Sequence, residues 1–164
     1  MRTTIQIPNK IFTRENLVKQ VFAWKLLGKK IVLTNGVFDV LHKGHISSLS
    51  EAAGYGEILI VAVNSDDSVK RLKGPTRPIN DEQARALLLA SLVQTDAIII
   101  FEEDTPLEII KAVLPSVLVK GGDYTIEQIA GAKEVIAAGG EVKIAAIVEG
   151  FSSTKIIEKM NEKL

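Results

Sequence analysis

The alternation of apolar and polar segments along the chain is the feature that most limits its fold. Strand-sized apolar runs, such as residues 58–63 (ILIVAV) and 97–101 (AIIIF), alternate with stretches whose apolar residues recur at helical spacing. Several runs are apolar at every position, which is typical of parallel strands covered by helices on both faces. The pattern predicts a doubly wound α/β fold, and we see no linker and no internal repeat.

The spacing of these runs predicts a five-stranded parallel sheet, for which the usual order is 3-2-1-4-5. The strands are expected at about residues 30–34, 57–63, 96–101, 116–120 and 142–148. An amphipathic helix at about residues 14–28 precedes the first strand, and further helices are expected at 45–53, before a basic loop through Arg77, at 81–94, near 105–114, up to Ala138 and from about Ser153. A length of 164 residues suits one core, so residues 1–164 are expected to form a single domain.

Composition removes several classes of protein. The 20 basic and 20 acidic residues cancel, so no overall charge attracts nucleic acid or a membrane surface, and neither is expected as a partner. The chain has no cysteine, which excludes disulfides, thiolate catalysis and cysteine-based zinc sites. Residues 1–12 lack the apolar core of a signal peptide, and no apolar run is long enough to span a membrane. We therefore expect a soluble, cytoplasmic protein.

Unusual polar sequences follow the strands rather than the helices. Ligands of open parallel sheets bind beyond the carboxyl ends of the strands. Here the first strand is followed by NGVFDVLHKGH, the second by NSDD, the fourth by KGGDY and the fifth by EGFSST. Neither the P-loop pattern nor the G-x-G-x-x-G pattern of dinucleotide-binding proteins is present. The sequence therefore predicts a binding site at this edge with a different device for holding phosphate.

Both histidines of the chain lie in one tetrapeptide, His42-Lys43-Gly44-His45, at the start of a predicted helix. A helix amino terminus carries unpaired N–H groups and partial positive charge, and Gly44 allows a ligand to approach the backbone. The imidazoles can donate hydrogen bonds to phosphate oxygens as charge builds in a transition state. Two alternatives stay open, namely histidines that only begin the helix and a zinc site in which Asp39 is a third ligand.

A set of ordered motifs resembles those of a known superfamily. Residues 34–39 (TNGVFD) followed by HKGH are similar to the signature of the HxGH nucleotidyltransferases, and within that superfamily the chain most resembles the D-glycero-β-D-manno-heptose 1-phosphate adenylyltransferase family over about residues 10–160. The matching segments are residues 62–80, 101–106, 118–124, 129–135 and 149–157. The resemblance implies ATP, carried with Mg²⁺, and a heptose 1-phosphate as substrates, a separate heptose kinase that supplies the acceptor, and a homodimer.

The resemblance also implies a reaction without a general base. The sugar phosphate attacks the α-phosphorus of ATP and pyrophosphate leaves. A phosphate monoester has a second pKa of about 6 and is already largely anionic at neutral pH. Catalysis would then rest on positioning and on stabilisation of charge.

The motifs and the resemblance together assign a role to residues of each loop. The catalytic residues are expected to be His42, His45 and Lys73. The nucleotide is expected to contact Asn35, Gly36, Phe38, Arg85, Lys120, Gly121, Gly122, Asp123, Ser152, Ser153 and Thr154. The acceptor is expected to contact Asn64, Asp66 and Arg77, with Lys120 as a further cation for its phosphate. No resident metal is expected.

Two of these segments have a plainer interpretation beside the functional one. Residues 70–73 (KRLK) can form a solvated surface loop, although Lys73 lies next to Gly74 and matches the phosphate-binding loop of the family. Residues 152–154 can simply cap the last helix. Superfamily members often carry an ISSTxxR motif there, whereas this chain has Phe151 and Ile157 in place of the isoleucine and the arginine. Lys155 is the cation available to compensate.

Two other functions fit parts of the pattern. The same catalytic core serves cytidylyltransferases that act on glycerol 3-phosphate or a related polyol phosphate, although the KGGDY loop and the amino-terminal helix favour the heptose branch. A non-catalytic nucleotide-binding module would need the KGGDY and SST loops but not paired histidines at the reacting phosphate.

Overall fold

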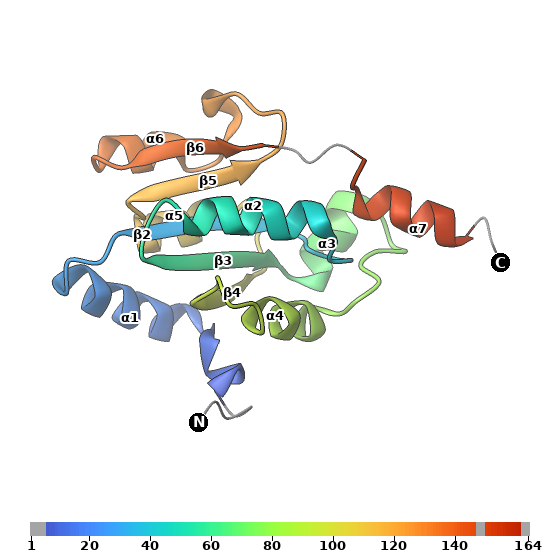
Figure 1. Ribbon diagram of the computed structural model, residues 1–164, viewed down its shortest axis with the longest axis horizontal. Coiled ribbons are helices and arrows are strands. Elements are labelled where there is room, and N and C mark those ends of the chain that lie inside the picture. Colours follow the sequence, from blue (N-terminus) through green and yellow to red (C-terminus); the bar gives the residue numbers. More distant parts are fainter. Residues whose placement is uncertain (1–5, 147–149, 162–164) are drawn as a thin grey trace.

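The computed structural model describes residues 6–146 and 150–161, and in this part of the chain one parallel sheet forms the centre of the molecule (Figure 1). Its six strands are β1 (Ile11–Phe12), β2 (Ile31–Gly36), β3 (Ile58–Asn64), β4 (Ala97–Phe101), β5 (Val117–Gly121) and β6 (Glu141–Ala145). They lie in the order β1-β4-β3-β2-β5-β6, and each pair of neighbours is parallel. The predicted parallel α/β fold is confirmed.

The predicted number of strands is wrong by one. The additional strand, β1, pairs with β4 through Ile11 opposite Ile98 and Phe12 opposite Ile99. Two residues are too few to produce a periodic pattern, so the sequence gives no sign of a strand before the first helix. The other five strands keep the order 3-2-1-4-5 among themselves, and β1 adds an edge strand beside β4.

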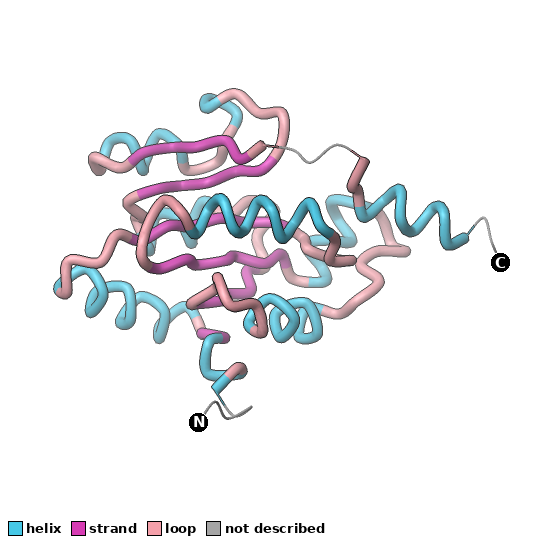
Figure 2. Tube along the Cα trace, in the orientation of Figure 1, coloured by secondary structure: helices cyan, strands magenta, loops and turns pink. Residues whose placement is uncertain are grey.

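Helices cover both faces of the sheet (Figures 1 and 2). Those that the structure describes are α1 (Arg14–Leu26), α2 (Lys43–Ala53), α3 (Asp66–Lys73), α4 (Glu82–Ala90), α5 (Leu107–Val113), α6 (Ala132–Ala137) and α7 (Ser153–Asn161), with short 3₁₀ turns at Pro8–Lys10 and Ile126–Gln128. Successive residues of β2 point to opposite faces, so Leu33 joins the core under α1, α5 and α6, whereas Val32 joins the core under α2 and α4. None of these helices has the length and apolarity that a membrane crossing requires.

The first helix shows how local sequence and burial agree. The Thr13 side chain caps α1 by accepting a hydrogen bond from the Asn16 N–H at 3.3 Å. Leu17 and Val21 are buried against the sheet. Gly28, with φ of +71°, turns the chain after the helix. The observed helix therefore ends within two residues of the predicted range 14–28.

The loop between the first long strand and the histidine motif is shorter than expected. β2 continues through Asn35 and Gly36, which pair with Ala62 and Val63 of β3. His42 is the N-cap of α2, so residues 37–42 alone separate the strand from the helix. At the far end of the sheet, β6 stops at Ala145, and residues 147 and 148 of the predicted last strand lie outside the described residues, as does residue 149 of the following motif. In Figure 1, α7 projects away from the body of the molecule.

Candidate active site

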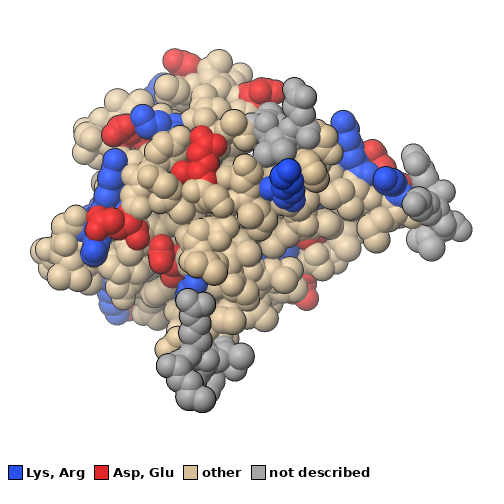
Figure 3. Space-filling model, in the orientation of Figure 1, with Lys and Arg blue, Asp and Glu red and all other residues tan. Residues whose placement is uncertain are grey.

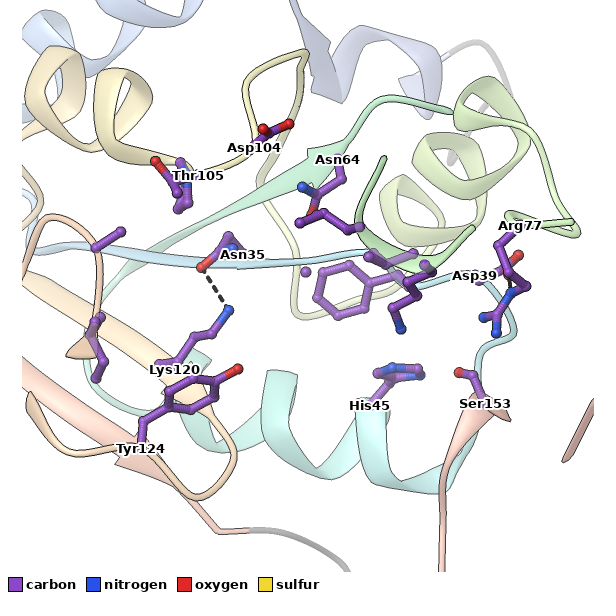
Figure 4. A pocket seen from close by; sticks show the side chains of 18 of the residues that line it. Asn35, Asp39, His45, Asn64, Arg77, Asp104, Thr105, Lys120, Tyr124 and Ser153 are labelled. Atoms are coloured by element: carbon purple, nitrogen blue, oxygen red, sulfur yellow. Dashed lines mark hydrogen bonds and ion pairs between the residues drawn. The ribbon is translucent and has the colours of Figure 1, made fainter. Parts of the chain in front are cut away.

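Two cavities open at the carboxyl edge of the sheet, where the loops that follow the strands meet, and Figure 4 shows the first of them. The first has a volume of about 390 Å³ and the second of about 300 Å³. His45, Lys73 and Ser153 line both, and we call these three residues the junction. The edge of the sheet predicted to hold the site therefore carries two adjoining cavities.

Most of the residues singled out in the sequence line one of these cavities. The first cavity, besides the junction, brings together Asn35, Gly36, Phe38, Asn64, Arg77 and Lys120. The second, besides the junction, brings together His42, Gly121, Gly122, Ser152 and Thr154. Three expected residues, Asp66, Arg85 and Asp123, line neither cavity.

The two imidazoles stack on each other at the amino terminus of α2. The ring centroids of His42 and His45 are 3.9 Å apart, with 22° between the planes. Their Nδ1 atoms are buried and have no hydrogen-bond partner among the described residues. Burial lowers the pKa of His42, and burial together with the charges of His42 and Lys73 lowers the pKa of His45 to about 4. At neutral pH the two imidazoles are therefore uncharged. An anion bound in the cavity would raise the pKa of both.

Phe38 also packs against the ring of His45. The centroids of the Phe38 and His45 rings are 5.2 Å apart. The backbone of Phe38 has φ of +52°, a conformation that is uncommon for a residue with a side chain and that recurs at functional sites. A Cβ at Gly36 would come within 3.0 Å of the Phe38 ring, so glycine at this position makes room for that ring.

Lys73 reaches the cavities because α3 ends there. Gly74, with φ of +96°, terminates the helix and turns the chain, and the Lys73 side chain lines both cavities. Burial, and next the charge of Arg77, lower the pKa of Lys73. Lys70 instead pairs with Asp67 at 3.0 Å on the exposed side of the helix, and Arg71 donates to Asp104 at 2.7 Å. The sequence predicted that Lys73, rather than Lys70 or Arg71, faces the site, and these positions agree with that prediction.

Arg77 is held in place by a buried carboxylate. Its Nε donates to Asp39 Oδ2 at 2.7 Å, while Asp39 Oδ1 accepts from the N–H groups of Ile79 at 2.7 Å and Asn80 at 2.9 Å. Burial alone raises the pKa of Asp39, but the hydrogen bonds from Asn80, Arg77 and Ile79 outweigh it and hold the pKa below its ordinary value. Nη2 of Arg77 is buried and has no partner among the described residues, so a donor remains for a ligand.

Arg85 and Asp66 tie loops together, and the structure does not place either of them at a cavity. The Arg85 guanidinium is fully buried, and its Nη2 donates to Asp66 Oδ1 at 2.7 Å. Its Nη1 donates to the carbonyl of Val37 at 2.7 Å and its Nε to the carbonyl of Asn80 at 3.0 Å. The Arg85 side chain thus connects the segments that follow β2, β3 and α3. The positions of Arg85 and Asp66 do not support the contacts with nucleotide and acceptor that were expected of them.

The end of β5 and the loop that follows it contribute residues to both cavities. Gly121 and Gly122 line the second cavity, whereas Lys120 lines the first, where its Nζ donates to Asn35 Oδ1 at 3.3 Å. Asp123 is exposed and lies outside both. The sequence predicted that this loop and the loop after β2 would meet, and the pairing of β2 with β5 brings them together.

Sequence reasoning missed several residues that line the cavities. Asp104 and Thr105 follow β4 and border the first cavity opposite Lys120, and Tyr124 and Gln128 border it from the segment after β5 (Figure 4). Phe151 borders the second cavity. Residues 101–106 were noted only for their resemblance, although the rule that ligands bind beyond strand ends applies to β4 as it does to the other strands.

The zinc alternative does not survive in the described residues. The Asp39 carboxylate accepts three N–H groups, two at Oδ1 and one at Oδ2, so its oxygens are engaged by residues 77–80 rather than directed at a metal near the histidines. No group of three His, Cys, Asp or Glu side chains converges anywhere in residues 6–146 and 150–161. The histidine pair is therefore interpreted as part of an anion-binding site.

Two adjoining cavities that meet at neutral imidazoles and a lysine suit the transfer of a phosphorus group between two ligands, and the class defined by this fold and this site is that of the nucleotidyltransferases. The chain matches the cytidylyltransferase-like family over residues 33–159 and belongs to that family. The resemblance seen in the motifs is thereby confirmed.

The relatives include long proteins and a short one. The chain is 55% identical over 150 residues to the bifunctional protein HldE of Koribacter versatilis, covering 92% of this chain and 31% of the relative. It is 50% identical over 170 residues to HldE of Pasteurella multocida, covering 98% and 36%. The crystal structure of the lipopolysaccharide core biosynthesis protein from Thermoplasma volcanium is similar, with a TM-score of 0.59, 33% identity, and coverage of 74% of this chain and 98% of that one. The chain thus spans about a third of the length of these HldE proteins.

Proposed function

We propose that this chain transfers the adenylyl group of ATP to D-glycero-β-D-manno-heptose 1-phosphate, giving ADP-heptose and pyrophosphate. The observation that carries the proposal is the junction, where His45, Lys73 and Ser153 line both cavities. A transfer between two phosphorylated substrates needs a binding site for each substrate. The two sites must adjoin where the attacking oxygen reaches the α-phosphorus. The likeness to HldE proteins supports the choice of this pair of substrates.

The second cavity is suited to the nucleotide. The amino terminus of α2 faces it through His42, Gly44 and His45, and hydroxyl groups of residues 152–154 lie around it. N–H groups at a helix amino terminus and hydroxyl donors bind phosphate oxygens. A Cβ at Gly44 would come within 3.0 Å of the His42 ring, so a side chain there would crowd the imidazole that faces the phosphates.

The first cavity is suited to the phosphorylated acceptor, and Asn35, Gly36 and Phe38, expected at the nucleotide, line this cavity and so move to the acceptor side in this proposal. Arg77 and Lys73 provide cations on the side of the cavity where His45 lies, and Figure 4 shows Asn64, Asp104 and Thr105 on a different side. The cations would hold the phosphate of the acceptor near the junction. The amide, carboxylate and hydroxyl groups would then face a polyhydroxylated body that is larger than glycerol.

The chemistry at the junction balances without a base. An oxygen of the sugar phosphate attacks the α-phosphorus of ATP, the bond from that phosphorus to the oxygen bridging to the β-phosphorus breaks, and pyrophosphate leaves with the electron pair. Neutral His42 and His45 would each donate one N–H to phosphate oxygens as charge develops, and Lys73 would add a full positive charge. Because the acceptor phosphate is already largely anionic, no proton has to be removed before attack.

We propose that Mg²⁺ enters with ATP as part of the substrate. The carboxylate of Asp39 already accepts three N–H groups, and Asp104 pairs with Arg71, so neither offers a ready set of oxygen ligands. Magnesium is commonly held by the phosphates of its nucleotide and by water. Activity should therefore require a divalent ion, and full activity after exhaustive chelation would contradict this.

The proposed source of the acceptor is supported by the same relatives, and the proposed homodimer by the family resemblance of the motifs. HldE proteins are named bifunctional, and this chain spans about a third of their length. We propose that a kinase activity supplies the heptose 1-phosphate and that this chain forms a homodimer, which sedimentation of the purified protein would test.

One assay tests the substrates. Pyrophosphate release is measured for four nucleoside triphosphates against several sugar and polyol phosphates. ATP with heptose 1-phosphate should exceed CTP with glycerol 3-phosphate by at least about 10²-fold in kcat/KM, because a small acceptor leaves buried polar groups unpaired. Equal or better use of CTP and glycerol 3-phosphate would instead identify a polyol phosphate cytidylyltransferase, and binding of nucleotide without any turnover would identify a non-catalytic module.

Variants at the junction test the mechanism. His45→Ala and His42→Ala should each lower kcat by about 10²–10³-fold, which is typical for loss of one donor to developing charge. Lys73→Ala should impair use of ATP far more than Lys70→Ala, which removes a matched lysine from the exposed side of the same helix. Equal effects of the two lysine variants would show that the cation at the junction is misassigned.

A further inference from the structure

Lys120 lies in the first cavity on a different side from the junction. It extends from β5, its Nζ is 3.3 Å from Asn35 Oδ1 on β2, and it is 5.5 Å from the centroid of the Tyr124 ring. In Figure 4, these three side chains form one group, and His45 and Ser153 lie apart from it across the cavity. The register of the two strands, in which Thr34 lies opposite Val119, places Asn35 and Lys120 side by side.

The backbone after β5 is shaped to bring the Tyr124 ring over Lys120. Gly122 has φ of +127°, a conformation that favours glycine. A Cβ at Gly122 would come within 2.8 Å of Cε2 of Tyr124, so the ring can take this position only beside glycine. Lys120 is thus held between an amide oxygen and an aromatic face, and within the described residues it forms no ion pair.

The groups that face Lys120 across the cavity differ from those around the junction. Lys73 and Arg77, whose buried Nη2 has no partner among the described residues, supply the cations beside His45. The opposite part of the cavity presents Asn64, Thr105 and Asp104. A carboxylate there would repel a phosphate, whereas amide, hydroxyl and carboxylate groups all pair well with sugar hydroxyls.

We propose that Lys120 determines acceptor specificity by binding hydroxyl groups on the part of the acceptor that carries no phosphate. An ammonium has three N–H donors, of which one is directed at Asn35, so two remain for neighbouring hydroxyl oxygens. Burial lowers the pKa of Lys120, which means that this group is costly to leave unpaired when a shorter acceptor fills the cavity. The proposal rests on the proposed function, and it removes Lys120 from the nucleotide site.

The test compares Lys120→Met with Lys70→Met, a matched loss of an exposed lysine. With ATP fixed, kcat/KM is measured for heptose 1-phosphate and for glycerol 3-phosphate, and KM for ATP is measured separately. Lys120→Met should lower kcat/KM for heptose 1-phosphate by about 10–100-fold, the loss expected for a buried hydrogen-bonding group, while kcat/KM for glycerol 3-phosphate stays the same or rises and KM for ATP changes less than about two-fold. Lys120→Arg, which keeps donors and charge, should recover part of the loss.

Other outcomes would overturn the proposal in distinguishable ways. An equal loss with both acceptors would mean that Lys120 binds the phosphate they share, and a raised KM for ATP would return it to the nucleotide site. Unchanged discrimination would leave it a structural residue. Calorimetric titration of heptose 1-phosphate into wild type and variants gives the same comparison without turnover. Absence of turnover with every substrate pair in the wild type would contradict the proposed function itself, whereas normal wild-type turnover with unaltered variants would contradict only the role of Lys120.

Discussion

Arg77 and Arg85 are both buried arginines paired with an aspartate, Asp39 and Asp66 respectively. Arg85 donates to three oxygens and lines neither cavity, whereas Arg77 lines the first cavity and its buried Nη2 has no partner among the described residues. The sequence predicted ligand contacts for both, because it shows the residue type but not which donors the fold consumes. Side chains such as His45 and Lys73 could be predicted because their motif positions alone bring them to the end of a strand or helix.

The burial of His45 makes stability depend on pH. Its pKa of about 4 lies below its ordinary value of 6.5, so the unfolded chain binds protons more readily than the folded one between these values. The free energy of unfolding should therefore fall as the pH is lowered from about 6.5 to about 4. Urea denaturation across this range should show that the free energy of unfolding of His45→Gln depends less steeply on pH than that of the wild type. His42, whose pKa is also lowered, should account for the remaining dependence. Identical pH dependence in wild type and variant would contradict the assignment.

At the scale of elements, the long strands and most helices follow the sequence because buried faces decide them. Ends and caps follow it less well. Asp81 is the N-cap of α4 and accepts from the Ala84 N–H at 2.8 Å, although Asn80 beside it is also a favoured capping residue type. Pro106 stands at the N-cap of α5, although Thr105 beside it is a favoured capping residue type. A cap depends on the backbone angles of one residue, and neighbouring polar residues offer the same side-chain chemistry, so a sequence cannot separate them.

The anchoring of residues 77–80 by Asp39 gives a prediction at this scale. Asp39→Asn places an NH₂ group opposite Arg77 or opposite the N–H groups of Ile79 and Asn80, so donors face donors. The free energy of unfolding should fall by about 3–5 kcal/mol, as when a buried ion pair loses one charge, and KM for the acceptor should rise because Arg77 is no longer held. Asp67→Asn, whose aspartate is exposed and pairs with Lys70, should change stability by less than about 1 kcal/mol. Urea denaturation of both variants makes the comparison, and similar losses would show that Asp39 anchors nothing.

For the whole molecule, the order of the five long strands was predictable because parallel strands joined by helices wind outward from a central switch point. The subdivision of the site into two cavities was not predictable, because it depends on how the side chains of several loops meet. Figure 3 shows acidic and basic side chains interspersed over the visible face. The positive charges that matter for an anionic substrate are therefore local ones, such as Lys73 and Arg77.

Separate cavities predict the order of events in catalysis. ATP and the acceptor can be bound together, so transfer should be direct, without a covalent enzyme intermediate. Initial-rate plots at several fixed concentrations of the second substrate should give intersecting lines. Labelled pyrophosphate should not exchange into ATP unless the acceptor is present. Parallel lines, or exchange without acceptor, would mean that a side chain at the junction takes up the adenylyl group.

The shared wall of the two cavities also bears on inhibitor design. A molecule that joins a nucleoside to a sugar through a non-hydrolysable diphosphate mimic would occupy both cavities at once and cross the junction at His45 and Lys73. Once one half is bound, the other is present at high effective concentration, so the joined compound can bind about 10²–10⁴-fold more tightly than either half, provided that the linker fits the span. Such a compound would compete with both substrates, and its preferred linker length would measure the distance across the junction in solution.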